Sequence, residues 1–128
     1  MSDSVELTIP VRSDLLILAR LTAAAMAARA EFGIEDIEDL RLVVEELCIS
    51  VIGTVTDGTL HLRYTENEGA ITVACSLWGE GGDDARGKSE PDELSLRIIE
   101  ALVDEYGEEM ADGRRQAWIR KYRSKVAS

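Results

Sequence analysis

A carboxylate and a hydroxyl lie one helical turn apart in the run from Asp39 to Ile52. Glu46 and Ser50 are four positions apart, and because that spacing returns to the same face of a helix, the two side chains point the same way. A carboxylate at the rim of a packed face can act as a general base, or can position water beside a bound phosphate. The same pair is common on ordinary helix surfaces, so its spacing alone predicts only a candidate base.

A glycine-rich polar segment, Gly79 to Lys88, follows a predicted strand and precedes a predicted helix. At such a junction the backbone N–H groups of Gly79, Gly81 and Gly82 are able to cradle an anion. The segment also carries three carboxylates, which repel phosphate unless a cation intervenes, and it matches neither the Walker nor the Rossmann glycine spacing. A solvent-exposed loop is therefore the alternative interpretation.

Hydrophobic periodicity predicts the elements that must hold these groups. Strands are expected at 5–9, 59–64, 70–78, 108–110 and 116–122, and helices at 14–32 and 34–52 and from a Ser89 cap to Gly107. We expect Ser13 to cap the first helix and Asp112-Gly113 to form a hairpin turn. This order predicts a two-layer α+β sandwich, in which helices cover one face of a mainly antiparallel mixed sheet. The whole chain, 1–128, is expected to be one domain.

Apolar stripes predict which side of each helix is buried. In the third helix the stripe comprises Leu94, Ile98, Leu102 and Tyr106. For the two tryptophans of the predicted strands, the sequence leaves two positions open. His61 is expected on the solvent face, Trp118 either in the core or as an exposed anchor, and Trp78 either at the sheet rim or in the space of a ligand.

Charge excludes two classes of partner. The 128 residues carry 14 Lys and Arg against 25 Asp and Glu, a net charge of −11, whereas nucleic acid and anionic membranes require clustered positive charge. Six of the basic residues lie from Arg114 onward, where no acidic residue occurs. This basic segment either balances an acidic body or provides a second surface for a second partner.

The cysteines and the absence of long apolar runs predict a cytoplasmic protein. Cys48 and Cys75 lie in apolar runs without any metal-binding spacing, which suits free thiols in a reducing compartment and argues against a zinc site. No apolar run approaches the roughly 18 residues that a membrane span needs.

The run DLRLVVEELCISVI, Asp39 to Ile52, resembles the helix that carries the first ATP motif of the anti-sigma-factor serine kinases. These proteins are histidine-kinase-like ATPases with the Bergerat fold, and the resemblance covers nearly the whole chain. The motif is a Glu followed four positions later by an Asn, often with a Cys between them. Glu46 and Cys48 match, and Ser50 stands where the Mg²⁺-binding Asn belongs. The resemblance implies that Glu46 activates the attacking hydroxyl and that Ser50 is the metal ligand.

The second motif of that family, Asp-x-Gly-x-Gly, reads the adenine amino group. It corresponds to the run from Leu77 to Gly81, in which Gly79 and Gly81 are kept and Leu77 replaces the Asp. Loss of a buried hydrogen-bond partner costs about 1–3 kcal/mol.

The third motif, Gly-Leu-Gly-Leu, closes on the phosphates at the start of the third helix. Here it reads Glu93-Leu94-Ser95-Leu96, so Leu94 and Leu96 match, and a carboxylate and a hydroxyl replace the glycines. A carboxylate near phosphate is repulsive.

A retained scaffold with three altered motifs favours an anti-sigma-factor-like regulator. The resemblance implies binding to a sigma factor, an anti-anti-sigma (STAS-type) protein or both, with ATP and Mg²⁺ binding weakened or lost, and a homodimer formed through the first strand and helix. The alternatives are an active serine kinase that phosphorylates an anti-anti-sigma factor, and an unrelated acidic interaction domain. We expect partner binding to depend less on Ser50 than on one acidic cluster, Glu35, Asp36, Glu38 and Asp39.

Overall fold

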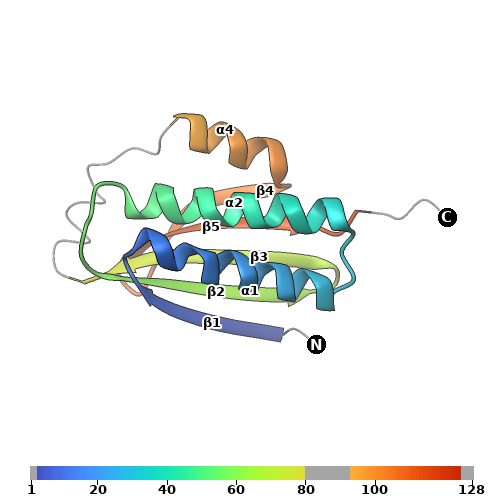
Figure 1. Cartoon of the computed structure of the whole chain (residues 1–128), viewed down its shortest axis with the longest axis horizontal. Coiled ribbons are helices and arrows are strands. Elements are labelled where there is room, and N and C mark those ends of the chain that lie inside the picture. Colours follow the sequence, from blue (N-terminus) through green and yellow to red (C-terminus); the bar gives the residue numbers. More distant parts are fainter. Residues whose placement is uncertain (1–2, 80–92, 125–128) are drawn as a thin grey trace.

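The computed structural model describes residues 3–79 and 93–124. The chain alternates between strands and helices, as Figure 1 shows. In order, the elements are β1 (Asp3–Pro10), a 3₁₀ turn (Ser13–Leu15), α1 (Leu16–Arg29), α2 (Ile34–Ile52), β2 (Thr59–Asn67), β3 (Ala70–Trp78), α4 (Glu93–Leu102), β4 (Glu105–Ala111) and β5 (Arg114–Tyr122).

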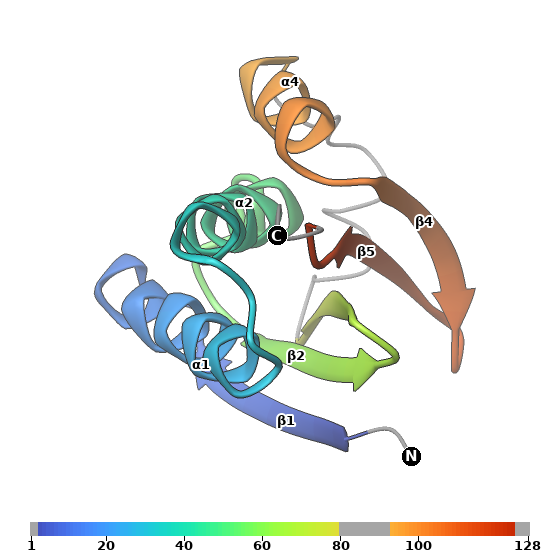
Figure 2. The same cartoon turned by 90° about the vertical axis from the view of Figure 1, so that its right-hand side faces the viewer.

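The five strands form one open sheet in the order β1-β2-β3-β5-β4, and every neighbouring pair is antiparallel. Two-residue turns join β2 to β3 and β4 to β5; Glu68, Gly69, Asp112 and Gly113 all have positive φ there, as the common hairpin turn requires. The described helices α1, α2 and α4 lie on one face of the sheet (Figure 2). The predicted two-layer α+β sandwich is confirmed, with a sheet that is antiparallel throughout its described pairs.

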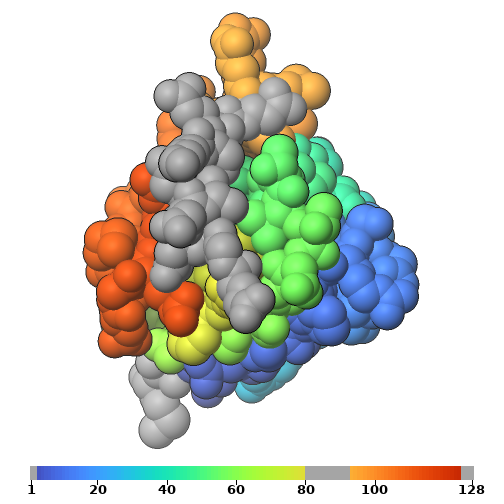
Figure 3. Space-filling model, turned by 90° about the vertical axis from the view of Figure 1, so that its left-hand side faces the viewer, coloured from blue at the N-terminus to red at the C-terminus, as the bar shows by residue number. Residues whose placement is uncertain are grey.

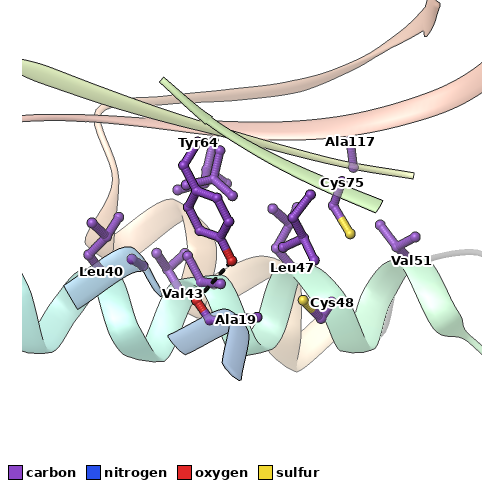
Figure 4. Close-up of a cluster of buried hydrophobic side chains, with 14 of the residues drawn as sticks. Ala19, Leu40, Val43, Leu47, Cys48, Val51, Tyr64, Cys75 and Ala117 are labelled. Atoms are coloured by element: carbon purple, nitrogen blue, oxygen red, sulfur yellow. Dashed lines mark hydrogen bonds between the residues drawn. The ribbon is translucent and has the colours of Figure 1, made fainter. Parts of the chain in front are cut away.

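The core lies between the helices and the central strands. Strand alternation directs Leu60, Leu62 and Tyr64 inward, and all three are buried. Figure 4 shows the Tyr64 ring pointing from the sheet toward the helices. Tyr64 is fully buried, and its hydroxyl donates a 2.9 Å hydrogen bond to the backbone carbonyl of Ala19. Three alanines of α1 are also fully buried, at positions 19, 23 and 27, where their small side chains fit the close approach of neighbouring elements.

The ends of the first helix differ from the sequence prediction. Ser13 does not cap it: α1 starts after a 3₁₀ turn, and no side chain caps that turn. The helix ends at Arg29 instead of Phe32, since Glu31 takes a left-handed φ of 63° and the Phe32 N–H bonds to the Ala27 carbonyl. This arrangement is a Schellman motif, and it brings Phe32 into the core.

The third predicted helix extends too far along the chain. α4 ends at Leu102, while Tyr106 and Gly107 belong to β4. The helical spacing of Leu102 and Tyr106 misled the prediction, because backbone pairing between Asp104 and Arg120 already begins the strand ladder. The buried residues of α4 are Ser95 and Ile99, whereas Leu94 is 63% exposed.

The second face of the sheet carries polar and aromatic side chains. His61 lies there as predicted, stacked on Trp78 with 4.2 Å between ring centroids. Trp118 is half-buried on the same face, because it alternates with the inward Ala117 and Ile119. A Cβ on Gly107 would lie 3.1 Å from the Trp118 ring, so this glycine makes room for the indole.

Candidate functional site

The candidate base, Glu46, lies on α2 at the junction with α4. The Ser95 hydroxyl donates a 2.7 Å hydrogen bond to Glu46 Oε1, and the glutamate side chain is half-buried. Its neighbour Glu45 points elsewhere, toward Arg20 of α1 at 3.9 Å. Figure 3 views the molecule from the end where α2 finishes, with α4 at the top. The helix periodicity therefore places Glu46 at the α2–α4 junction and the preceding residue, Glu45, at the α1–α2 junction.

Ser50 is half-buried one turn after Glu46, as its spacing predicts. Its hydroxyl donates a 2.8 Å hydrogen bond to the backbone carbonyl of Leu47. A helical serine that bonds back to the preceding turn keeps its proton within its own helix, and its oxygen retains its lone pairs.

The residues of the second motif separate onto different sides of the sheet. Leu77 is 1% exposed and belongs to the apolar core. Trp78 points to the opposite face, where the Arg114 guanidinium lies 4.3 Å from its ring and its Nε1 donates to Ser76 Oγ. The interpretation of Trp78 as an occupant of nucleotide space is therefore wrong, because strand alternation turns it away from the helices.

Gly79 ends the described part of this segment, and Gly81 lies outside the described residues. Gly79 has a φ of +131°, and a Cβ added to it would lie 2.9 Å from the Gly58 Cα. The glycine is thus required where the chain leaves β3 beside the start of β2. In the third motif Leu94 is exposed and Leu96 is half-buried, and Ser95 between them is buried and bonds to Glu46 of α2.

The described residues do not fit magnesium–ATP as a set of donors. An adenine amino group needs a polar acceptor, and Leu77 offers an apolar, buried side chain instead. Mg²⁺ is held mainly by carboxylate oxygens and waters, whereas Ser50 offers a single hydroxyl oxygen where the family pattern has an Asn. Within residues 3–79 and 93–124, no three His, Cys, Asp or Glu side chains group closely enough to hold a metal ion.

The acidic cluster predicted as a partner surface is partly internal. Asp36 is buried, and it accepts hydrogen bonds from the backbone N–H of Ser124 at 3.0 Å and the Ser124 hydroxyl at 3.1 Å. Lys121 Nζ lies 3.7 Å from Asp36 and 3.9 Å from Asp39. Glu35 and Glu38 are exposed. The cluster therefore divides into residues that join α2 to β5 and residues that face solvent.

The basic segment is likewise engaged within the chain. Arg115 and Arg120 pair with Glu108 and Glu105 of the adjacent β4. Arg123 donates to the Ala30 carbonyl, and Lys121 donates to the Leu102 carbonyl. These contacts favour the interpretation of the segment as a counterweight to acidic neighbours over a free basic surface.

Comparison with known families decides the relationship of the chain. A model of the histidine kinase-like ATPase domain matches residues 9–121. The chain belongs to the histidine kinase-like ATPase family. The alternative of an unrelated acidic domain is therefore excluded. The matched residues include Glu46, Ser50 and Leu77.

Individual relatives of this family member are serine-protein kinases by name. The protein "Serine-protein kinase RsbW" of Halalkalibacterium halodurans is 29% identical over 83 residues, which cover 63% of this chain and 51% of that protein. Its counterpart from Bacillus cereus is 29% identical over 76 residues, covering 59% of this chain and 42% of that protein. The chain thus spans about half the length of the curated relatives it matches. Among its described helices, none is both long and apolar enough to cross a membrane.

The sequence analysis does not predict two buried polar contacts, one made by Ser95 and one made by Lys121. Ser95 was noted only as a replacement for glycine, although a hydroxyl in place of a glycine beside a candidate base is itself a signal. Lys121 follows the inward positions 117 and 119 by strand alternation, so its charge needed a buried partner, which Asp36 provides.

Proposed function

We propose that this chain is an anti-sigma-factor-like regulatory protein of the cytoplasm that binds a sigma factor, an anti-anti-sigma (STAS-type) protein or both, with ATP binding weakened or lost. The family fold and the serine-protein kinase relatives support the class of protein. The observation that carries the loss of ATP binding is the apolar, fully packed Leu77 where the family pattern has its adenine-reading Asp. Binding of a partner needs the scaffold and its surface, and not the nucleotide.

Titration of the full chain with candidate sigma factors and anti-anti-sigma proteins, without nucleotide, tests this proposal. We expect a complex with at least one partner of these classes, at micromolar or tighter affinity. Ser50→Ala is the matched control, because Ser50 bonds only to its own helix, and it should leave the affinity unchanged. Absence of any complex across both classes would overturn the proposal.

An active serine kinase is the second candidate. The observation in its favour is Glu46, whose carboxylate already accepts a hydrogen bond from a serine hydroxyl at 2.7 Å, as a general base for a serine substrate must. Calorimetry with ATP and Mg²⁺ separates the two functions. A dissociation constant below about 100 μM, corresponding to roughly 5.5 kcal/mol, together with phosphate transfer that Glu46→Ala abolishes, would establish the kinase.

We also propose a homodimer through β1 and α1. An apolar groove of about 400 Å³ lies between these elements and is lined by Val5, Leu18, Leu21, Ala25 and Met26 among others. β1 is also an edge strand, and exposed edges and apolar patches favour association. Sedimentation should give a dimer mass, and Leu21→Glu should yield monomers with an unchanged circular dichroism spectrum. A monomeric native chain would overturn the dimer.

A further inference from the structure

Among the described residues, the N-terminal half of α4 has one buried side chain, that of Ser95. The buried residues of the whole helix are Ser95 and Ile99, and Ser95 is 3% exposed. Glu93, Leu94 and Arg97 around it are exposed, and Arg97 pairs along the helix with Glu93. The Ser95 hydroxyl, bonded to Glu46 at 2.7 Å, is therefore a buried polar contact that joins this half of the helix to α2.

The C-terminal half of α4 is held independently. Ile99 packs into the core, and the Leu102 carbonyl accepts a 2.7 Å hydrogen bond from Lys121 Nζ. Asp36 and Asp39 in turn hold that ammonium group. Loss of the Ser95 contact should therefore free the first turns of α4 without detaching the helix.

We propose that Ser95 is an autoinhibitory latch, whose hydroxyl takes the place on Glu46 that the hydroxyl of a substrate serine would take. The contact places a serine O–H at hydrogen-bond distance from the carboxylate, which is the relation a general base has to its substrate. Because Ser95 is almost fully buried, α4 also covers the oxygen it bonds. While the Ser95 hydroxyl bonds Glu46 Oε1, a substrate hydroxyl has to compete with it for that oxygen. The regulatory meaning of this latch rests on the second candidate function, the serine kinase, in which Glu46 is the base.

Helix propensity makes Ser95→Ala an informative variant. Alanine favours the helical state more than serine does, so the substitution by itself should tighten α4. Any loosening must then come from the lost hydrogen bond to Glu46. A hydrogen bond to a charged group contributes roughly 1.5–3 kcal/mol, which corresponds to about a tenfold or larger change in an opening equilibrium.

Two measurements on the free full-length chain test the latch. The first is carbodiimide labelling of carboxylates, read by mass spectrometry, in which Ser95→Ala should label Glu46 about tenfold faster. Glu45, one position away and facing α1, is the internal control and should label at an unchanged rate. The second is hydrogen exchange of amides 97–99 of α4, whose helical acceptors are the carbonyls of residues 93–95. These amides should accelerate by a similar factor, while the Val103 amide, bonded to the Ile99 carbonyl, and the α2 amides stay protected.

A set of variants keeps the result interpretable. Glu46→Ala should accelerate α4 exchange as Ser95→Ala does, the double variant should add nothing to either, and Glu45→Ala should leave α4 unchanged. Glu46→Gln retains an acceptor without the charge, so its α4 exchange rate should lie between those of the wild type and Glu46→Ala. Unchanged Glu46 labelling in Ser95→Ala, unchanged α4 exchange, or additive effects in the double variant would each overturn the latch. No partner or nucleotide is present, so failure here leaves the proposed function standing, and failure of partner titration leaves the latch standing.

Discussion

Asp36 is a charged side chain inside the molecule, and its neighbours explain how the fold accommodates it. Burial disfavours its ionised form, but the hydrogen bonds from the Ser124 backbone and hydroxyl and the charge of Lys121 outweigh that cost. The pKa of Asp36 therefore lies below the usual value of an aspartate. The residue joins the first turn of α2 to the end of β5, which makes it a structural residue and not part of a partner surface.

Asp36→Asn should lower the free energy of unfolding by about 2 kcal/mol at pH 7, because the Lys121 ammonium loses its buried partner. A lowered folded-state pKa stabilises the fold above the unfolded value of about 3.9, and this contribution is lost as pH falls through the folded pKa. The difference between wild type and variant should therefore be largest near neutral pH and shrink below about pH 4. Urea unfolding from pH 3 to 7 measures it. Glu35→Gln, its exposed neighbour, should change stability little, and a difference that does not vary with pH would contradict this account.

Tyr64→Phe should cost about 1 kcal/mol at pH 7, since it removes the buried hydrogen bond to Ala19 and leaves the ring packing intact. Burial and the neighbouring thiols Cys48 and Cys75 raise the pKa of Tyr64 above its ordinary value. A raised folded-state pKa stabilises the fold below about pH 10 and loses that effect as pH rises further. The deficit of the variant should therefore narrow above pH 10. Urea unfolding at pH 7 and 10.5 measures it, with the exposed Tyr122→Phe as control; an equal deficit at both pH values would refute it.

At the scale of elements, strand alternation was the most reliable guide and helix ends were the least. The inward positions of β2 and β3 follow directly from a period of two, because one sheet face is covered by helices. The ends of α1 and α4 depend on long-range contacts, namely burial of Phe32 and pairing of Asp104 with Arg120. The side of α4 that contacts α2 also escaped prediction, since Ser95 reads as polar until its partner Glu46 is known.

Gly79→Ala should lower the free energy of unfolding by about 1–3 kcal/mol, because an alanine at this φ is strained and its Cβ would meet the Gly58 backbone. The cost arises where β2 and β3 meet and involves no ligand. Thermal unfolding of the free protein measures it. Gly33→Ala is the matched control, since nothing lies within 4 Å of its Cβ position, and it should cost less than about 1 kcal/mol. A Gly79→Ala protein of native stability would show that the close approach to Gly58 does not constrain the fold.

At the scale of the whole molecule, the basic residues that cluster near the end of the sequence do not form a separate surface of unpaired basic side chains among the described residues. Each Lys and Arg among the described residues has a partner within the chain, whether a carboxylate, a backbone carbonyl or, for Arg114, the Trp78 ring. The chain nevertheless has a net charge of −11. The sequence predicted the sign of the net charge. Only the fold shows that carboxylates of β4 and α2 pair with Arg115, Arg120 and Lys121 of β5.

This excess of negative charge should act on partner binding mainly through the rate of association. Attraction between opposite charges raises association rates and is screened by salt. A partner of the proposed class that presents a positive surface should therefore associate about tenfold or more slowly when ionic strength rises from 0.02 to 0.5 M. Among the predicted acidic cluster, Glu35 is exposed whereas Asp36 is internal. Glu35→Gln should therefore reduce the association rate without changing the free energy of unfolding. Asp36→Asn should lower the free energy of unfolding without changing the association rate. Stopped-flow association at several salt concentrations separates these effects. A rate independent of salt would mean that the negative charge serves solubility alone, because unpaired carboxylates near an interface cannot escape screening.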